Sequence, residues 1–331
     1  MFKSYRLVAL AACLLLSFQV FPSRGAQRPD NVAQRTDNVA QRPGAATVRP
    51  DPGMVVLRVT ITGPRNKPLP RLEPENLRIT EDGVEQKIGY FALDAEPPSV
   101  AIVWGIQDDT LMADSRLVPL DFLETLARSA PLRSVNDRIA DLSRRQLSNP
   151  VFEYFLIHGA PSANGSPSVA VAFSTDVKAL PRIYPPARGS LDAVYVGLDV
   201  LKESAFSKKA LIMIAESVDA TLSGEHYKQF AIREGVPVYY ILAGGDTGEG
   251  ALQVEELANV SGGDGYLALT GGAIENYALE IAQGLNNQYL VGYHPQKDPD
   301  GKWRKLGVRV TPPDGSPKLR ARTKSGYYSR R

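Results

Sequence analysis

Three side chains with ligating oxygens follow one strongly apolar segment of the chain. Residues Val100–Trp104 form a continuous apolar run, which is typical of a strand buried in a parallel sheet. Gln107, Asp108 and Asp109 come shortly after it. Ligands of open α/β sheets bind just beyond the carboxyl ends of the strands, and oxygen atoms are the donors that hard divalent cations require. The segment therefore predicts a binding loop, whose candidate ligands are a divalent cation or polar groups of a partner.

Other reactive side chains give no comparable pattern. The three histidines, His158, His226 and His294, do not form the paired spacing of a zinc site. The chain has no GxSxG motif of a serine hydrolase, and the glycine-rich Gly244–Gly250 lacks the Gly-Lys-Ser/Thr ending of a phosphate-binding loop. We therefore predict no catalytic residues and a non-enzymatic protein. An enzyme whose chemistry these patterns do not reveal is kept as a third hypothesis.

Composition argues against nucleic acid as the partner. The 331 residues include 38 Lys or Arg and 36 Asp or Glu, so charge is nearly balanced. Such a balance gives no electrostatic reason to expect nucleic acid or an anionic membrane surface. The length allows about two domains. After the N-terminal apolar run, no segment of the sequence has the length and apolarity expected of a transmembrane span.

Residues 1–25 are predicted to be a secretory signal peptide. Lys3 and Arg6 precede the apolar run Leu7–Phe21, and small residues follow it. We therefore expect a secreted or periplasmic protein. The tetrapeptide that ends at Cys13 resembles a lipobox, which leaves a membrane-anchored lipoprotein as the alternative. The apolar run continues beyond Cys13, however, whereas a lipobox usually closes it. Without that anchor the mature chain has no cysteine and no disulfide.

Residues 26–52 are predicted to be a disordered linker. Their first part reads AQRPDNV, AQRTDNV, AQRPG, a seven-residue repeat with one sizeable apolar residue in each full unit. Such a composition buries too little surface to offset the entropy of ordering the chain. The linker separates the signal peptide from the residues expected to fold.

Strands and helices are predicted to alternate over residues 96–286. This alternation favours a doubly wound α/β domain, in which a parallel-type sheet is covered by helices on both faces. The expected strands are 99–104, 151–158, 169–173, 210–215, 236–242 and 265–269. The expected helices are 117–130, 135–147, 190–201, 225–234, 252–260 and 273–286.

Only strands are predicted on either side of this domain. Alternating or β-branched runs cover 55–62, 77–80 and 84–91 in the early block, 53–95. An Asp-Gly pair between the last two runs predicts a hairpin. Late strands are expected at 288–293, 303–310 and 318–322, within 287–331. We expect both blocks to form one small β-sandwich-like module, into which the α/β domain is inserted. Its aromatic residues are expected mainly in the core, and a recognition patch is the alternative. These aromatics are Tyr289, Tyr293, Trp303, Tyr327 and Tyr328.

Several blocks together resemble one family of exported proteins. The early block contains LRVTITG and NKPLPRLEPENLRITEDGVEQKIGYF, and the middle contains GSLDAVYVGLDVL and ALIMIAESVDA. The late blocks are VEELANVSGGDGYLAL, LNNQYLVGYHPQKDPDGKWRKLGVRV and LRARTKSGYY. Residues 54–328 thereby resemble the acidobacterial VWFA-related family, which has a von Willebrand factor type A (VWA) core. The resemblance implies a Rossmann-type VWA-like sheet with a metal-ion-dependent adhesion site (MIDAS) built from three loops.

The three loops depart from the family pattern at the residues that would hold the metal. The first loop normally reads DxSxS, and Gly105, Gln107 and Asp109 stand at its ligand positions. The second loop supplies a hydroxyl, for which Ser190 stands. The third supplies an aspartate, for which Glu216 stands, with Asp219 three residues further on. The resemblance therefore implies a degenerate MIDAS with no functional metal. A remodelled site that holds Mg²⁺ or, more readily, Ca²⁺ is the alternative.

The sequence thus favours an exported protein-binding module that engages an unidentified protein partner. The predicted contact residues lie on the three degenerate loops. They are Gln107, Asp108, Asp109, Ser190, Glu216 and Asp219. The second hypothesis is a structural or assembly component of the cell envelope that acts through the β-module. The sequence does not predict the oligomeric state.

Overall fold

A computed structural model describes residues 51, 53–63, 70–107, 118–119, 122–123, 152–159, 166–174, 187–220 and 224–330. The signal peptide, Cys13 and nearly all of the linker lie outside the described residues. So do Asp108, Asp109 and most of the helices expected at 117–130 and 135–147. In the described part of the chain, no helix has the length and apolarity needed to cross a membrane.

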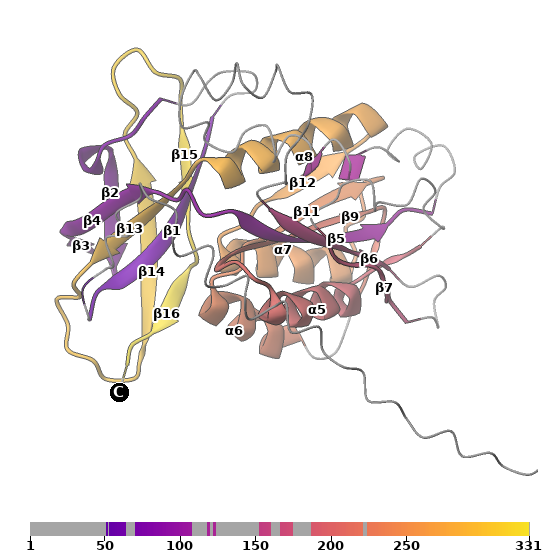
Figure 1. Cartoon of the computed structure of the whole chain (residues 1–331), viewed down its shortest axis with the longest axis horizontal. Helices are drawn as coiled ribbons and strands as arrows, with labels where there is room; N and C mark the ends of the chain where they lie inside the picture. Colours follow the sequence, from indigo (N-terminus) through magenta and orange to yellow (C-terminus); the bar gives the residue numbers. More distant parts are fainter. Residues whose placement is uncertain are drawn as a thin grey trace, which may run out of the picture. The chain divides into compact units, whose positions relative to one another are not determined.

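A six-stranded sheet forms the centre of the α/β domain (Figure 1). The strand order is β12-β11-β9-β5-β6-β7. Five strands run parallel, and β7 pairs antiparallel with β6 at one edge. In sequence order this is the 3-2-1-4-5-6 winding of doubly wound folds. The strands are β5 (Pro98–Gly105), β6 (Glu153–His158), β7 (Ser168–Ser174), β9 (Lys208–Ala215), β11 (Val238–Ala243) and β12 (Gly265–Ala268).

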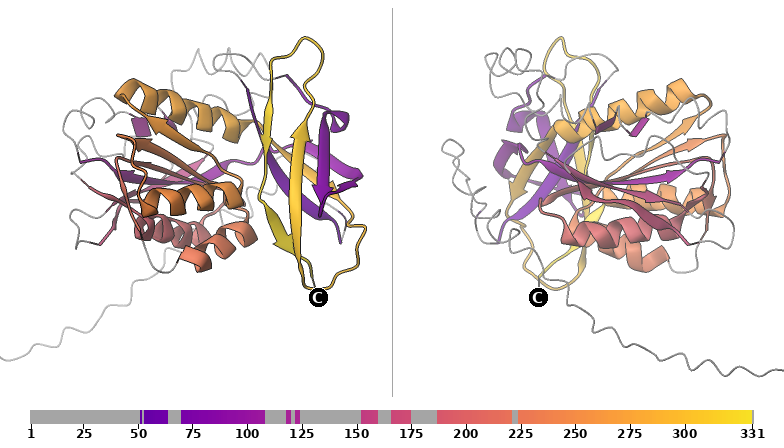
Figure 2. Two further views of the ribbon diagram at one scale, coloured as in Figure 1. Left: turned by 180° about the vertical axis from the view of Figure 1, so that it is seen from behind. Right: turned by 45° about the vertical axis from the view of Figure 1, so that its right-hand side comes forward.

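Helices cover both faces of this sheet (Figures 1 and 2). On β5, Val100, Ile102 and Trp104 belong to the core beneath α8. Ala101 and Val103 belong to the opposite core, beneath α5, α6 and α7. All five are buried, as the continuous apolar run of a strand covered on both sides requires. The helices are α5 (Leu191–Val200), α6 (Gly224–Glu234), α7 (Glu249–Ser261) and α8 (Gly271–Asn286).

Local residue chemistry sets the ends of these helices. The side chains of Ser190 and Thr270 accept hydrogen bonds from backbone N–H groups in the first turns of α5 and α8. Gly262 ends α7 in the left-handed conformation, with φ of 88°. A short 3-10 helix (Leu201–Glu203) continues from α5.

Two four-stranded antiparallel sheets form the β-module. Their orders are β15-β1-β13-β4 and β16-β14-β2-β3, so each sheet combines early and late strands. Leu57, Ile79 and Val291 are among the residues of one shared, buried core. The strands are β1 (Val55–Thr62), β2 (Leu77–Glu81), β3 (Val84–Gln86), β4 (Ile88–Leu93), β13 (Gln288–Tyr293), β14 (Trp303–Val310), β15 (Arg320–Arg322) and β16 (Gly326–Tyr328).

These sheets confirm the predicted fold class, a doubly wound α/β sheet inserted into a β-sandwich-like module. The Asp-Gly hairpin is also present, since β2 pairs with β3 and both Asp82 and Gly83 have positive φ. One expected strand is wrong. Residues 84–91 form two strands, because β3 pairs with β2 whereas β4 pairs with β13 in the other sheet. The exact domain bounds 53–95, 96–286 and 287–331 stay predictions.

Candidate functional site at the carboxyl edge of the sheet

The first and third predicted loops meet at the carboxyl edge of the central sheet. Gly105 ends β5 and pairs with Ala215, which ends β9. The backbone N–H of Glu216 donates to the carbonyl oxygen of Gly105 at 3.1 Å. In return, the Glu216 carboxylate accepts from the backbone N–H of Gln107, with 2.7 Å between Oε1 and N. The third-loop carboxylate therefore fastens the first loop.

The second loop joins them through two short strands. β8 (Gly189–Ser190) pairs parallel with β10 (Val218–Asp219), so Ser190 stands opposite Asp219. The N–H of Ala187 donates to the carbonyl oxygen of Ile106 at 3.0 Å, which links the second loop to the first. The described members of the predicted set thus come from three loops that are bonded to one another. Asp108 and Asp109 lie outside the described residues.

Backbone occupies the space beside Gly105, where the family pattern has its first metal-binding aspartate. A Cβ atom added to Gly105 would lie 2.5 Å from the nitrogen and 2.6 Å from the Cα of Gly189. Real Cβ contacts are essentially never that short. An aspartate at this position would have to displace the second loop. The residues present therefore do not fit the metal site of the family.

The remaining hydroxyl and carboxylate have partners within the edge itself. Ser190 is buried, and its Oγ accepts from the N–H of Ala193 at 3.2 Å. Asp219 forms an ion pair with Arg188, with 3.4 Å between Oδ2 and Nε. In the described part of the chain, no group of three or more His, Cys, Asp or Glu residues is arranged to hold a metal ion.

The sequence did not predict a role at this edge for two residues, Arg188 and Asp246. Arg188 brings a positive charge next to Asp219. Asp246, in the loop after β11, accepts from the N–H groups of Val218 and Gly248 at 2.9 and 2.8 Å. It therefore holds the glycine-rich loop against β10. The only sequence signal for Arg188 was its position directly before Gly189–Ser190. Nothing in the sequence connects Asp246 with Val218.

His158 lies near this edge but adds little positive charge. It ends β6 and stands opposite Trp104 in the parallel pair of β5 and β6. Burial lowers the pKa of His158 below its usual value. The lowered pKa disfavours a charged imidazolium at this position, whereas Arg188 forms an ion pair with Asp219.

The order of strands, the antiparallel edge strand and the three loops at one edge together decide the fold. The α/β domain is VWA-like. Sequence comparison adds no assignment to this, since no protein-family model matches the chain and no curated protein matches it either.

Comparison with solved structures finds similar chains at low sequence identity. The PilB minor pilin from Streptococcus sanguinis is 10% identical, with a TM-score of 0.41, and the match covers 58% of this chain and 62% of the pilin. A von Willebrand factor type A protein from Catenulispora acidiphila is 8% identical, with a TM-score of 0.41, and the match covers 87% and 75% of the two chains. BatB from Bacteroides thetaiotaomicron is 13% identical, with a TM-score of 0.32, and the match covers 56% and 97%.

Proposed function

We propose that this chain is an exported, non-enzymatic protein-binding module with a degenerate MIDAS. Its VWA-like domain engages a protein partner through the carboxyl edge of the sheet, and the contact does not require a divalent metal. The proposed contact residues are Gln107, Asp108, Asp109, Ser190, Glu216 and Asp219.

The contact between Gly105 and Gly189 is the observation that carries this proposal. Intact MIDAS loops surround a metal ion, and a partner carboxylate can complete its coordination. Here the position of the first metal ligand has no side chain and no room for one. The carboxylate of Glu216 accepts a hydrogen bond from a backbone N–H, and the carboxylate of Asp219 pairs with a guanidinium. Direct polar contacts to a partner are what such a surface can still make.

Calorimetry tests the metal-independent part of the proposal. Mg²⁺, Ca²⁺ and Mn²⁺ are titrated separately into the full chain and into a Glu216→Ala variant. We expect no micromolar binding of any of the three ions to either protein. Micromolar binding that disappears in Glu216→Ala would establish the remodelled metal site and overturn the proposal.

Site-specific crosslinking tests the location of the contact. A photoreactive amino acid is placed at the exposed Gln107 and, as a matched control, at the exposed Glu203. Glu203 follows the C-terminus of α5, whereas the N-terminus of α5 lies at the carboxyl edge. We expect a crosslinked partner from position 107 alone, in equal yield with and without EDTA. Crosslinking from position 203 alone, or its loss in EDTA, would contradict the proposal.

A further inference from the structure

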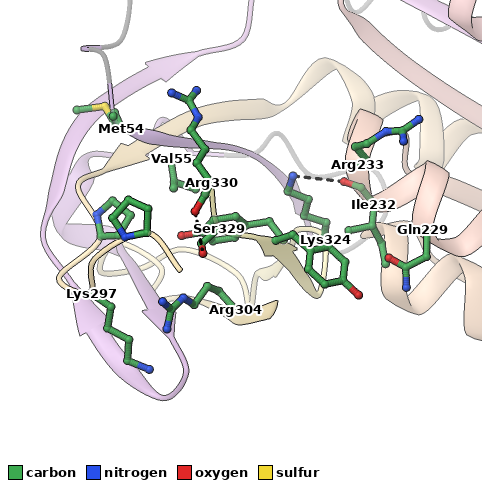
Figure 3. Close-up of a pocket in the computed structure, with 15 residues that line it drawn as sticks. Met54, Val55, Gln229, Ile232, Arg233, Lys297, Arg304, Lys324, Ser329 and Arg330 are labelled. Atoms are coloured by element: carbon green, nitrogen blue, oxygen red, sulfur yellow. Dashed lines mark hydrogen bonds between the residues drawn. The ribbon is translucent and has the colours of Figure 1, made fainter. Parts of the chain in front are cut away.

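A groove of about 670 Å³ lies between α6 and the C-terminal part of the β-module (Figure 3). Its size is in the range of sites that hold ligands, which is roughly 300 to 1,000 Å³. One wall is formed by Gln229, Ile232 and Arg233 of α6. The others come from residues 53–55, from the connection between β13 and β14, and from residues 327–330. The groove is separate from the carboxyl edge described above.

The lining of this groove is positively charged. Among the described residues that line it, five are cationic and none is acidic. Three of these cations are partly neutralised by acidic neighbours. Arg233 pairs with Glu234, Lys297 pairs with Asp82, and Arg304 pairs with Asp82 and Asp300. The five cations are Arg233, Lys297, Arg304, Lys324 and Arg330.

Lys324 and Arg330 carry most of the charge that a ligand would meet. The Lys324 ammonium reaches across to α6 and donates to the carbonyl oxygen of Ile232 at 3.3 Å (Figure 3). Burial lowers the pKa of Lys324, which means that its charge is incompletely solvated. Arg330 is exposed at the rim. A carboxylate beside the Lys324 ammonium would gain a charge-assisted hydrogen bond in a partly desolvated setting, and Arg330 adds an exposed positive charge at the rim.

The groove also borders an open edge of a β-sheet. β16 is the outer strand of its sheet, paired only with β14 among the described strands. The backbone N–H of Leu306 donates to the carbonyl oxygen of Ser325, and the N–H of Ser329 donates to that of Lys302. The backbone groups of Ser325, Tyr327 and Ser329 therefore face β14. By the alternation of an antiparallel ladder, the backbone of Tyr328 faces away from β14. Tyr328 is 58% exposed, and its ring packs edge-on against that of Trp303.

We propose that this groove binds an extended, acidic peptide segment of a partner protein, which lies beside β16. Peptides recognised in this way combine main-chain hydrogen bonds to a strand edge with side-chain contacts at alternate positions. The cations select carboxylates, while Met54, Val55 and Ile232 give apolar contact to the intervening residues. The chain's own segment 26–49 is a poorer occupant, because it contains four arginines and only two aspartates.

Fluorescence anisotropy with a defined probe tests this proposal. The probe is a labelled ten-residue peptide that alternates Glu and Thr, and the control peptide has Gln in place of every Glu. We expect the full chain to bind the acidic probe with a micromolar Kd and the Gln peptide at least about tenfold more weakly. Equal binding of both peptides, or no binding of the acidic one, would overturn the proposal.

Four variants locate the site. Arg330→Gln should weaken binding about fivefold or more, whereas Arg309→Gln, an exposed arginine on β14 outside the groove lining, should leave it unchanged. Tyr328→Pro removes both the ring and the outward backbone N–H, whereas Tyr328→Ala removes the ring alone. The proline variant should therefore weaken binding more than the alanine variant does. Thermal unfolding checks that each variant is folded. A response to Arg309→Gln equal to that of Arg330→Gln would refute the assignment.

A heparin oligosaccharide separates a peptide site from a general polyanion site. We expect heparin to compete weakly, because a sugar chain cannot pair with the edge of β16. Tight binding of heparin that Tyr328→Pro leaves unchanged would show that the groove binds polyanions by charge alone, and it would overturn the peptide assignment.

Discussion

The carboxylate of Glu216 accepts a hydrogen bond from the backbone N–H of Gln107, with 2.7 Å between Oε1 and N. These residues follow β9 and β5, which are neighbours in the central sheet. In a VWA metal site, the acidic group of the third loop would be available to the ion. Here it closes a contact between two loops. The first and third loops of the edge are therefore joined by a side-chain hydrogen bond in addition to the backbone bond from Glu216 to Gly105.

Removing the Glu216 carboxylate should loosen this edge. We expect Glu216→Ala to lower the free energy of unfolding by about 1 to 2 kcal/mol, because the Gln107 N–H loses a charged acceptor. Glu216→Gln keeps an acceptor oxygen and should cost less. Urea denaturation measures both, and hydrogen exchange at the Gln107 amide should quicken in the alanine variant. An unchanged exchange rate would show that the contact is not formed in solution.

An aspartate introduced at position 105, where the DxSxS pattern has its first metal ligand, should damage the fold instead of creating a metal site. In Gly105→Asp, the new side chain meets the backbone of Gly189 at a distance that no relaxed structure shows. We expect a loss of about 3 kcal/mol or more and no gain of Mg²⁺ binding. Thermal unfolding and calorimetry measure the two effects.

The matched control is Gly272→Asp in the first turn of α8. A Cβ atom there meets no atom within 4 Å, and an acidic residue in the first turn of a helix is favourable. This variant should keep the stability of the parent chain. A stable Gly105→Asp protein that binds Mg²⁺ would show that the second loop moves easily, contrary to the geometry.

Most of the fold could be predicted because the pattern of each strand reflects its own burial. The bounds expected for β1, β13 and β14 agree with the structure. The error at 84–91 has a physical reason. Local alternation continues through residue 87, whereas the change of sheet between β3 and β4 depends on pairing with the distant β13.

The candidate site was less accessible to sequence reasoning. Ser190 and Glu216 could be placed because each follows a recognisable element. The roles of Arg188 and Asp246 depend on how loops far apart in the sequence fold together. The groove was missed for the same reason, since its lining comes from four separate segments. Only its tyrosines, Tyr327 and Tyr328, had been considered, as an alternative to core packing.

A buried carboxylate in the β-module gives a third prediction. Glu81 is 1% exposed and accepts from the hydroxyls of Tyr293 and Tyr327 at 2.7 and 2.8 Å. Tyr293→Phe should lower the free energy of unfolding by about 1.5 to 3 kcal/mol, because the buried carboxyl group of Glu81 loses one of its hydrogen-bond donors. Tyr328→Phe, at an exposed ring, is the control and should change stability by less than about 0.5 kcal/mol. If Glu81 is first replaced by Leu, the effect of Tyr293→Phe should shrink, which a double-mutant cycle measures.

The fourth prediction concerns Lys208 at the start of β9. Its side chain is 2% exposed, and its ammonium donates to the carbonyl oxygen of Asp94 at 3.1 Å. Burial lowers the pKa of Lys208 from 10.5 to about 8, although Asp94 and Glu96 oppose the shift, while Arg58 adds to it. Between pH 8 and 10.5, the unfolded chain therefore binds more protons at this residue than the folded chain does. Stability should rise with pH across that window, since the cost of a buried charge disappears as the folded lysine loses its proton.

Lys208→Met separates this effect from every other titration. The variant keeps the length of the side chain but has no proton to lose, so the rise in stability with pH should be absent from it. The difference in the free energy of unfolding between the parent chain and the variant should grow by about 3 kcal/mol from pH 7 to pH 10.5, as the lowered pKa of Lys208 implies. Burial raises the pKa of Tyr239 to about 12. The raised pKa of Tyr239 makes the free energy of unfolding fall with pH at the upper end of the window. This effect is the same in the parent chain and in the variant, so it cancels from their difference. Urea denaturation at pH 7, 8, 9, 10 and 10.5 measures the difference. A difference that stays constant over this range would mean that Lys208 keeps its ordinary pKa and is solvated in the folded chain.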